Sequence, residues 1–312
     1  MNDQQIIDWL LEGDVSIQYQ VWRDLLNAEK KNLQARITNE GWGMKILSKR
    51  KSDGHWGDGF YQPKWISTHY TLLDLRNLNL PSNNETVQET IKLVLQNNMA
   101  DDGGIRLGPS TAQNSDVCVN GMFLNYSSYF KTPEKKLRCI IDCILNEIMP
   151  DGGFNCRTTR KGAKHSSLHS TLSVLEGFTE FQKTGFTYRE KEISDAIKTG
   201  VEFILMHRLF LSDHTGQIID KNFLKLTYPC RWKYDILRAM DYLQYAGIKW
   251  DNRMTEALAY LNKKQNKDGT WNVHAAHSGQ VHIIMEKAGK SSKWNTLRML
   301  RIKKYFKLNN YS

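Results

Sequence analysis

Apolar residues recur at three- and four-residue intervals along one class of segments, with charged residues on the opposite side. This spacing predicts amphipathic α-helices. Each of them runs into a turn that contains glycine, as helix C-termini commonly do. The clearest examples are 85–99, 133–148 and 254–266.

A second class of segments follows these turns and has fewer charges and more small residues. Such a composition predicts helices that are buried on most sides. The members of this class are 64–78, 115–130, 166–181 and 231–247. No segment has the pattern of a strand, so the sequence predicts an all-α protein.

The turns that join the two classes of helix repeat along the chain. Four of them have the form Asp-Gly-x followed by an aromatic or aliphatic residue, and a fifth, at 213–220, is more divergent. Their glycines are separated by 49, 49, 64 and 53 residues. These glycines are Gly54, Gly103, Gly152, Gly216 and Gly269. A period of about fifty residues indicates a repeated supersecondary unit, here a pair of helices.

The alternation of charged and buried helices favours a closed ring, an α/α toroid, because one helix of each pair would then face the axis. An open solenoid of the same pairs is the alternative. We expect a single domain over 1–312, with N-terminal helices in 1–50 and the glycine-turn repeats in 51–312.

Composition narrows the class of protein further. The 312 residues are 40% hydrophobic, enough for a large core, and no stretch approaches the ~20 apolar residues of a membrane span. The first residues do not resemble a signal peptide, so a cytoplasmic location is expected. Five cysteines without CxxC spacing argue against a disulfide framework. The net charge of +10 comes with no nucleic-acid-binding motif, so no nucleic-acid partner is expected.

The repeats resemble a known family. The segment EALAYLNKKQNKDGTW, at 256–271, is similar to the QW motif of squalene and oxidosqualene cyclases. The Gly-Gly turns resemble the prenyltransferase repeats in the β subunits of protein farnesyl- and geranylgeranyltransferases. This resemblance covers roughly residues 45–305. It implies a six-fold α/α barrel whose central cavity holds an isoprenoid.

The resemblance also implies a metal site. In the protein prenyltransferases, one Gly-Gly repeat is followed by Asp-x-Cys and the next by a histidine that leads a helix, and these three residues hold a catalytic Zn²⁺. This chain has Asp116 and Cys118 after one Gly-Gly turn and His169 after the next. Three protein ligands would leave the fourth zinc position open. The structural alternative is a core cysteine, a helix-capping Asp and a hydrogen-bonded histidine.

Further residues are predicted to line the cavity, which we expect to be mostly apolar and aromatic. The family's basic clamp for a diphosphate is missing beside Asp116, and Arg157, Arg160 and His165 on the loop before His169 are a predicted replacement. A solvated basic loop is the alternative. Aromatic and polar residues near the starts of the inner helices complete the predicted lining, because aromatic faces stabilise carbocations. They are Trp56, Trp65, His69, Tyr228, Trp232, Tyr234, His282 and Trp294.

These features predict an isoprenoid-handling enzyme of prenyltransferase or terpene-cyclase type. Its ligand would be an isoprenoid or another hydrophobic small molecule, with or without a diphosphate, and no partner subunit is indicated. One alternative is a metal-free terpene cyclase with Asp116 or Asp235 as its acid. Another is a non-catalytic toroid that binds a lipid or a protein. Toroidal glycosidases are not favoured, because they need paired carboxylates in the cavity and the inner helices are poor in them.

Overall fold

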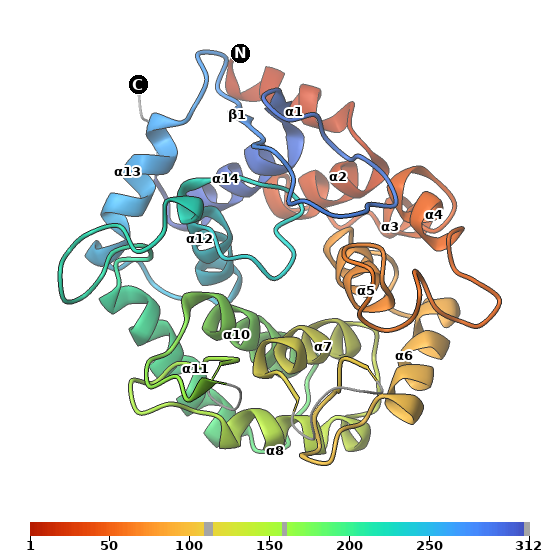
Figure 1. Ribbon diagram of the computed structural model, residues 1–312. Coiled ribbons are helices and arrows are strands. Elements are labelled where there is room, and N and C mark those ends of the chain that lie inside the picture. Colours follow the sequence, from red (N-terminus) through yellow and green to blue (C-terminus); the bar gives the residue numbers. More distant parts are fainter. Residues whose placement is uncertain (109–114, 158–160, 309–312) are drawn as a thin grey trace.

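The computed structural model describes residues 1–108, 115–157 and 161–308, and the helices in these ranges form a ring around one axis (Figure 1). In this part of the chain, the helices that face the axis are α2 (Val15–Gln20), α5 (Thr68–Asn77), α7 (Val117–Tyr129), α10 (Leu168–Lys183), α12 (Ile236–Tyr245) and α14 (Lys293–Tyr305). Around them lie α1 (Asp3–Leu11), α3 (Lys31–Arg36), α4 (Gly41–Leu47), α6 (Glu85–Asn97), α8 (Arg138–Asn146), α11 (Glu190–Met206) and α13 (Thr255–Lys263). The predicted α/α toroid is confirmed.

Short elements connect the helices. A π-helical turn extends α2, and three 3₁₀ turns lie in the connections; they are Val21–Leu25, Glu134–Lys136, Lys221–Leu224 and Asn252–Met254. Strands β1 (Trp271–Asn272) and β2 (Ser291–Ser292) pair antiparallel and close the loop before α14. No helix within the described ranges is both long and apolar enough to cross a lipid bilayer.

The two predicted classes of helix differ in burial as expected. The outer helix α6 buries a single face, which includes Val87, Ile91 and Val94. The inner helix α7 is buried at every position from Val117 to Ser128 except Cys118. The charge difference between the two classes therefore follows from their places in the ring.

The repeated turns share one set of hydrogen bonds. Two residues after the glycine comes an apolar residue with no exposed surface, and its N–H donates to a polar side chain in the first turns of the next inner helix. These bonds are Trp56 N–Thr68 Oγ1 (3.0 Å), Ile105 N–Asn120 Oδ1 (2.8 Å), Phe154 N–Thr171 Oγ1 (2.9 Å) and Trp271 N–Thr296 Oγ1 (3.1 Å). The φ angles of the four glycines lie between +84° and +89°, which glycine adopts most readily. Each turn thus docks onto the helix that follows it.

Charged side chains fill the middle of the ring. The pairs are Arg231–Asp74, Arg76–Glu180, Arg238–Glu176, Arg298–Asp241, Arg301–Asp241, Arg301–Asp24 and Arg23–Asp24. The side chains of Arg231 and Asp74 are each only 5% exposed. The middle of the ring is therefore charged. The view that the inner helices are poor in carboxylates is wrong, since α5, α10 and α12 supply four of them to these pairs.

Helices α7 and α10 make the tightest crossing in the ring, at Gly121 and Gly177. A Cβ atom on Gly177 would overlap the carbonyl oxygen of Gly121, and one on Gly121 would lie 2.7 Å from the carbonyl oxygen of Ser173. Only hydrogen atoms fit between the two backbones at this point. Their closeness sets the separation of the helix starts that carry Asp116 and His169.

Replacing Gly177 by alanine should destabilise the protein. The clash is with backbone, which relaxes poorly, so we expect a net loss of roughly 1–3 kcal/mol in the free energy of unfolding despite the better helix propensity of alanine. Gly108→Ala is the control, because a Cβ there meets no atom within 4 Å and φ lies outside the left-handed region. Urea denaturation measures the free energy of unfolding of both variants. Equal midpoints for the two variants would refute the tight crossing.

Candidate active-site cleft

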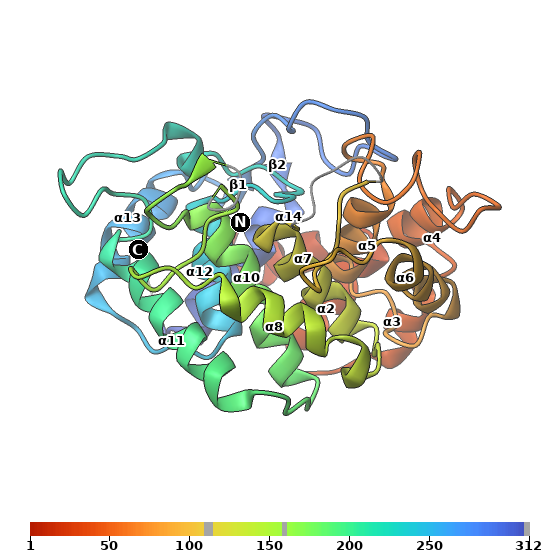
Figure 2. The ribbon, with the colours of Figure 1, turned by 60° about the horizontal axis from the view of Figure 1, so that its bottom comes forward.

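The long loops gather at the end of the ring where the inner helices begin (Figure 2). Residues of these loops and of the helix starts line a large cleft. Its volume is about 1970 Å³. This exceeds the ~300–1,000 Å³ typical of sites for drug-sized ligands, so an extended ligand fits it better than a compact one. Its walls come from the start of α7, the turn and loop before α10, the end of α11 and the loop before α12.

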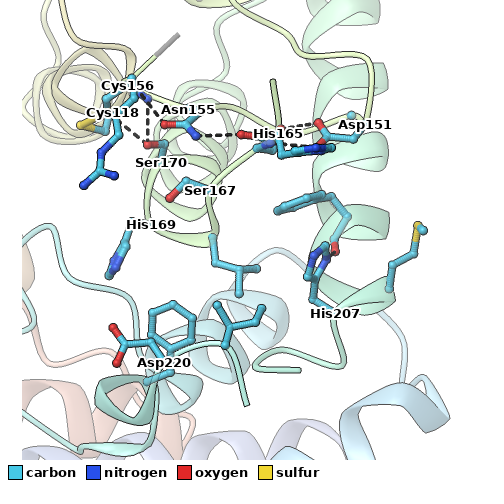
Figure 3. Close-up of a pocket in the computed structure, with 18 of the residues that line it drawn as sticks. Cys118, Asp151, Asn155, Cys156, His165, Ser167, His169, Ser170, His207 and Asp220 are labelled. Atoms are coloured by element: carbon cyan, nitrogen blue, oxygen red, sulfur yellow. Dashed lines mark hydrogen bonds between the residues drawn. A yellow bond between two sulfur atoms is a disulfide. The ribbon is translucent and has the colours of Figure 1, made fainter. Parts of the chain in front are cut away.

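His169, in the first turn of α10, extends into this cleft with Asp220 on the facing wall (Figure 3). Its Nδ1 accepts a hydrogen bond from the Tyr234 N–H at 2.7 Å. Burial, together with the positive charges of Lys233 and Arg238, lowers the pKa of His169 to about 4. The imidazole is therefore neutral near pH 7, and with Nδ1 accepting, its proton lies on Nε2. His169 can donate a hydrogen bond to a ligand, but it is a poor proton acceptor.

Asp116 lies just before α7 and lines the same cleft. It occupies the N-cap position, yet its side chain makes no capping hydrogen bond to the described backbone of α7. The residue is 7% exposed. The carboxylate of Asp116 therefore lines the cleft wall. It does not cap α7, which was the structural alternative considered for this residue.

The predicted zinc centre is not supported. Cys118 is joined to Cys156 in a disulfide, with Cα atoms 6.1 Å apart, and both residues line the cleft (Figure 3). Among the described residues, no three His, Cys, Asp or Glu side chains are grouped so that they could hold a metal ion. Asp116 and His169 line one cleft, as the repeat spacing predicted, but without a metal-binding arrangement. The sequence argued against a framework of several disulfides, and among the described residues one disulfide is present beside three free cysteines.

A lysine surrounded by aromatic rings lines the same cleft as Asp116 and His169. The Lys64 Nζ is 5.2, 5.7 and 5.9 Å from the ring centroids of Tyr61, Trp65 and Trp232, and Lys233 Nζ is 4.0 Å from that of Trp232. Cation–π attraction holds ammonium groups in this way. Trp65 and Trp232 were predicted from the sequence as lining residues, whereas Tyr61, Lys64 and Lys233 were not. Tyr61, Lys64 and Lys233 lie in the segments that lead into inner helices, as Asp116 does. This position in the sequence was the feature from which they could have been predicted.

The hydroxyl group of Tyr61 takes part in a hydrogen bond. Its hydroxyl oxygen accepts from the hydroxyl of Tyr70 at 3.0 Å. Burial raises the pKa of Tyr70, so its hydroxyl remains protonated and can donate this hydrogen bond. The hydrogen bond from Tyr70 holds the Tyr61 hydroxyl in place, and the Lys64 ammonium lies 5.2 Å from the centroid of the Tyr61 ring.

The basic patch predicted on the loop before His169 lies only partly within the described residues. Arg157 and His165 line the cleft and are exposed, whereas Arg160 lies outside the described residues. Acidic residues line the cleft as well. Asp151 accepts hydrogen bonds from Ser166, and Glu202 pairs with Arg253 at 2.6 Å. Lys64 and Lys233 line the cleft as well, and the charge of Lys233 acts on His169.

Most of the other predicted lining residues have structural roles. Trp56 Nε1 donates to the Ile46 carbonyl at 2.8 Å, and Tyr234 Oη to the Leu209 carbonyl at 2.6 Å. Asp235 caps α12 by accepting from the Arg238 N–H at 2.8 Å. The remaining assignments are His69 beside Tyr126 (3.2 Å), His282 beside Thr71 (2.8 Å), Trp65 Nε1 to the Ser278 carbonyl (2.9 Å), and Tyr228 stacked on Trp294 with ring centroids 4.7 Å apart. None of these residues lines the cleft, although the Tyr234 N–H contacts His169.

The comparisons with known proteins bear on the fold. No family model matches the chain, and no curated protein matches its sequence. Among solved structures, it is similar to a polysaccharide lyase, with a TM-score of 0.55 and 13% identity over 100% of this chain and 99% of that one. It is also similar to a glycosyl hydrolase family 88 protein from Bacteroides vulgatus, with a TM-score of 0.52 and 13% identity over 93% and 90% of the two chains.

These findings correct the family resemblance. The similar structures carry the names of carbohydrate enzymes, whereas the QW-like motif and Gly-Gly turns pointed to cyclases and prenyltransferases. The isoprenoid function inferred from that resemblance is wrong, and neither the metal-free cyclase nor the lipid- or protein-binding toroid gains support. At 13% identity the likeness shows the fold alone, and that fold is the α/α toroid.

Proposed function

We propose that this protein is an enzyme that cleaves an acidic carbohydrate chain by β-elimination in the cleft at the N-terminal ends of the inner helices. The observation that carries the proposal is the set of side chains around His169. A carboxylate, a phenol, a neutral imidazole and two ammonium groups line one open cleft that is long enough for several sugars. The names of the two structures of similar fold agree with a carbohydrate substrate.

Each group suits one requirement of β-elimination on a uronic acid. Lys64 and Lys233 would neutralise the uronate carboxylate and so make the neighbouring C5–H more acidic. The indole of Trp232 offers a flat apolar surface for a sugar ring. His169, neutral with its proton on Nε2, would donate a hydrogen bond to the substrate. These residues come from two loops and an inner helix that the glycine turns hold in place.

The proton transfers balance without a co-reactant. Asp116 would accept the proton from C5, and the electron pair of that C–H bond would form the C4=C5 double bond as the C4–O4 bond breaks. Tyr61 would give its proton to the departing O4. The hydrogen bond from Tyr70 and the ammonium of Lys64 would stabilise the phenolate that remains.

Turnover of uronate-containing polysaccharides tests the proposal. Polymers with and without uronic acid are incubated with the protein, and the ultraviolet absorbance of a conjugated C4=C5 uronate is followed together with reducing ends. We expect absorbance and reducing ends to rise together on uronate polymers alone. Reducing ends without absorbance would indicate hydrolysis and refute elimination. No cleavage of any acidic or neutral polymer would refute the proposed function.

Substitutions at the proton-transfer residues should abolish most of that activity. We expect Asp116→Asn and Tyr61→Phe each to lower kcat by at least about 10²-fold with little change in unfolding temperature, since proton transfer contributes typically 10²–10⁴-fold. Asp195→Asn is the matched control, because Asp195 is exposed on the outer helix α11. Activity of the Asp116→Asn enzyme within threefold of wild type would remove Asp116 from the mechanism.

The pH profile tests the state of His169. Its pKa is lowered to about 4, so the neutral form present at pH 7 persists as the pH falls past 6.5, the ordinary value for histidine. We therefore expect no acidic limb near pH 6.5 in the kcat/KM profile of the wild-type enzyme. His169→Gln should lower the rate and leave the shape of the profile unchanged. A limb near 6.5 that disappears in His169→Gln would show that the imidazole titrates normally and is no neutral donor.

A further inference from the structure

One of the five repeated turns, the divergent one around Gly216, differs from the other four in its packing. A Cβ atom on Gly216 would meet no described atom within 4 Å, whereas in the other four turns a Cβ on the glycine would meet a neighbour within 3.2 Å. Ile218, two residues after Gly216, is 43% exposed, although the residue at this position is fully buried in the other four turns. The core of the ring therefore does not explain the apolar residues of this turn.

The turn around Gly216 forms a hairpin that is bonded to the end of α11. Leu211 pairs with Ile218 in an antiparallel bridge, and the Ile219 N–H donates to the Phe210 carbonyl at 3.0 Å. The N–H groups of Phe210 and Leu211 both donate to the carbonyl of His207, the residue that follows α11. The hairpin and the helix end thus form one unit, and residues of both line the cleft.

Three large apolar side chains of this unit are exposed in the cleft. Met206 is 51% exposed and Ile219 is 45% exposed, and both line the cleft together with Ile218. We call these three residues the apolar patch. The buried rings of Phe203 and Phe223 line the same cleft. Exposed apolar side chains that are grouped on one surface commonly mark a binding site.

The apolar patch adjoins the residues proposed to act on the substrate. The Phe223 ring packs edge-on against that of His169, with the ring centroids 5.3 Å apart. Ile219 directly precedes Asp220, which lies on the wall facing His169 (Figure 3). A polymer bound beside His169 would therefore reach the apolar patch with a neighbouring sugar.

The chemistry of the apolar patch favours a short acyl group. The edge of an unmodified sugar presents hydroxyl groups, with which the side chains of Ile218 and Ile219 form no hydrogen bonds. A long alkyl chain would also meet the charged Glu202 and Asp213, which belong to the same helix and hairpin and line the cleft. The methyl group of an O-acetyl ester needs only a small apolar surface, and the flexible Met206 side chain adapts its shape to such a group.

We propose that the apolar patch is a subsite for O-acetyl groups, so that the polymer bound in the cleft is an acetylated uronate polysaccharide. The inference rests on the proposed function in taking a carbohydrate as the ligand of the cleft. The methyl group of the ester would lie against Met206, Ile218 and Ile219, which lose exposed surface when it binds. The ester is recognised and not cleaved, so no further reaction is involved.

Calorimetric titration of the whole Asp116→Asn protein tests this subsite, because the proposed reaction is blocked in this variant. Tetrasaccharides prepared from acetylated uronate polymers are titrated in two forms, as isolated and after mild alkali has removed the acetyl groups. We expect the acetylated form to bind at least about threefold more tightly, since burial of one apolar carbon contributes about that factor. Equal affinities of the two forms, or no binding of either form at millimolar concentration, would overturn the proposal.

Substitutions in the hairpin locate the acetyl group. Ile218→Thr and Ile219→Thr keep a β-branched side chain, which suits an extended backbone, and remove apolar surface. We expect each to lower the preference for the acetylated form about twofold, with unchanged affinity for the deacetylated form. Ile284→Thr is the matched control, since Ile284 is 82% exposed and is not among the described residues that line the cleft. An unchanged preference in both hairpin variants would contradict the assignment.

The subsite and the reaction fail separately in these experiments. Cleavage of uronate polymers by the wild-type protein, combined with equal affinities for the two tetrasaccharide forms, would remove the subsite and keep the elimination reaction. Binding that depends on the acetyl groups, without cleavage of any polymer, would keep the subsite and refute the reaction.

Discussion

The ion pairs between inner helices determine what the rest of this toroid can do. Arg231 of the loop before α12 reaches Asp74 of α5, on the opposite side of the ring, and Arg238 of α12 reaches Glu176 of the neighbouring α10. The ring is thus joined across its interior as well as between neighbours. Buried pairs of this kind add little net stability, but breaking one by removing a single partner costs about 3–5 kcal/mol. Ion-paired side chains therefore occupy the interior of the ring. Such a charged interior does not suit an apolar ligand along the axis, and the space for a large substrate lies above the helix starts.

The glycine turns supply the second constraint. Each turn places a buried residue whose N–H is bonded to the helix that follows, as Phe154 is bonded to Thr171. This bond fixes where the inner helix begins and therefore where the residues around its first turn lie. Asp116 and His169 occupy such positions in neighbouring repeats, and the Gly121–Gly177 crossing keeps their helices close. Side chains from distant parts of the sequence thus line one cleft.

The fold could be predicted from the sequence because its causes are local and repeated. Helix periodicity, the charge difference between outer and inner helices and the Asp-Gly turns each depend on residues a few positions apart. The positions of Asp116 and His169 followed from the same repeat. The chemistry could not be obtained in this way, since the Asp-x-Cys and His pattern is compatible with a disulfide as well as with a metal, and Cys156, the partner of Cys118, carries no signal of its own. The pairing of Arg231 with Asp74 joins residues 157 positions apart, and local patterns treat both as surface charges.

The central claim is that a polymeric substrate binds above the inner helices and not along the axis. A crystal structure of the inactive Asp116→Asn protein with a uronate-containing tetrasaccharide tests it most directly. The account predicts density for several sugars in the cleft, with one carboxylate near Lys64 and Lys233, one ring against Trp232 and a hydrogen bond from His169 Nε2. Sugar density bound elsewhere on the protein, with the cleft empty at saturating ligand, would contradict it.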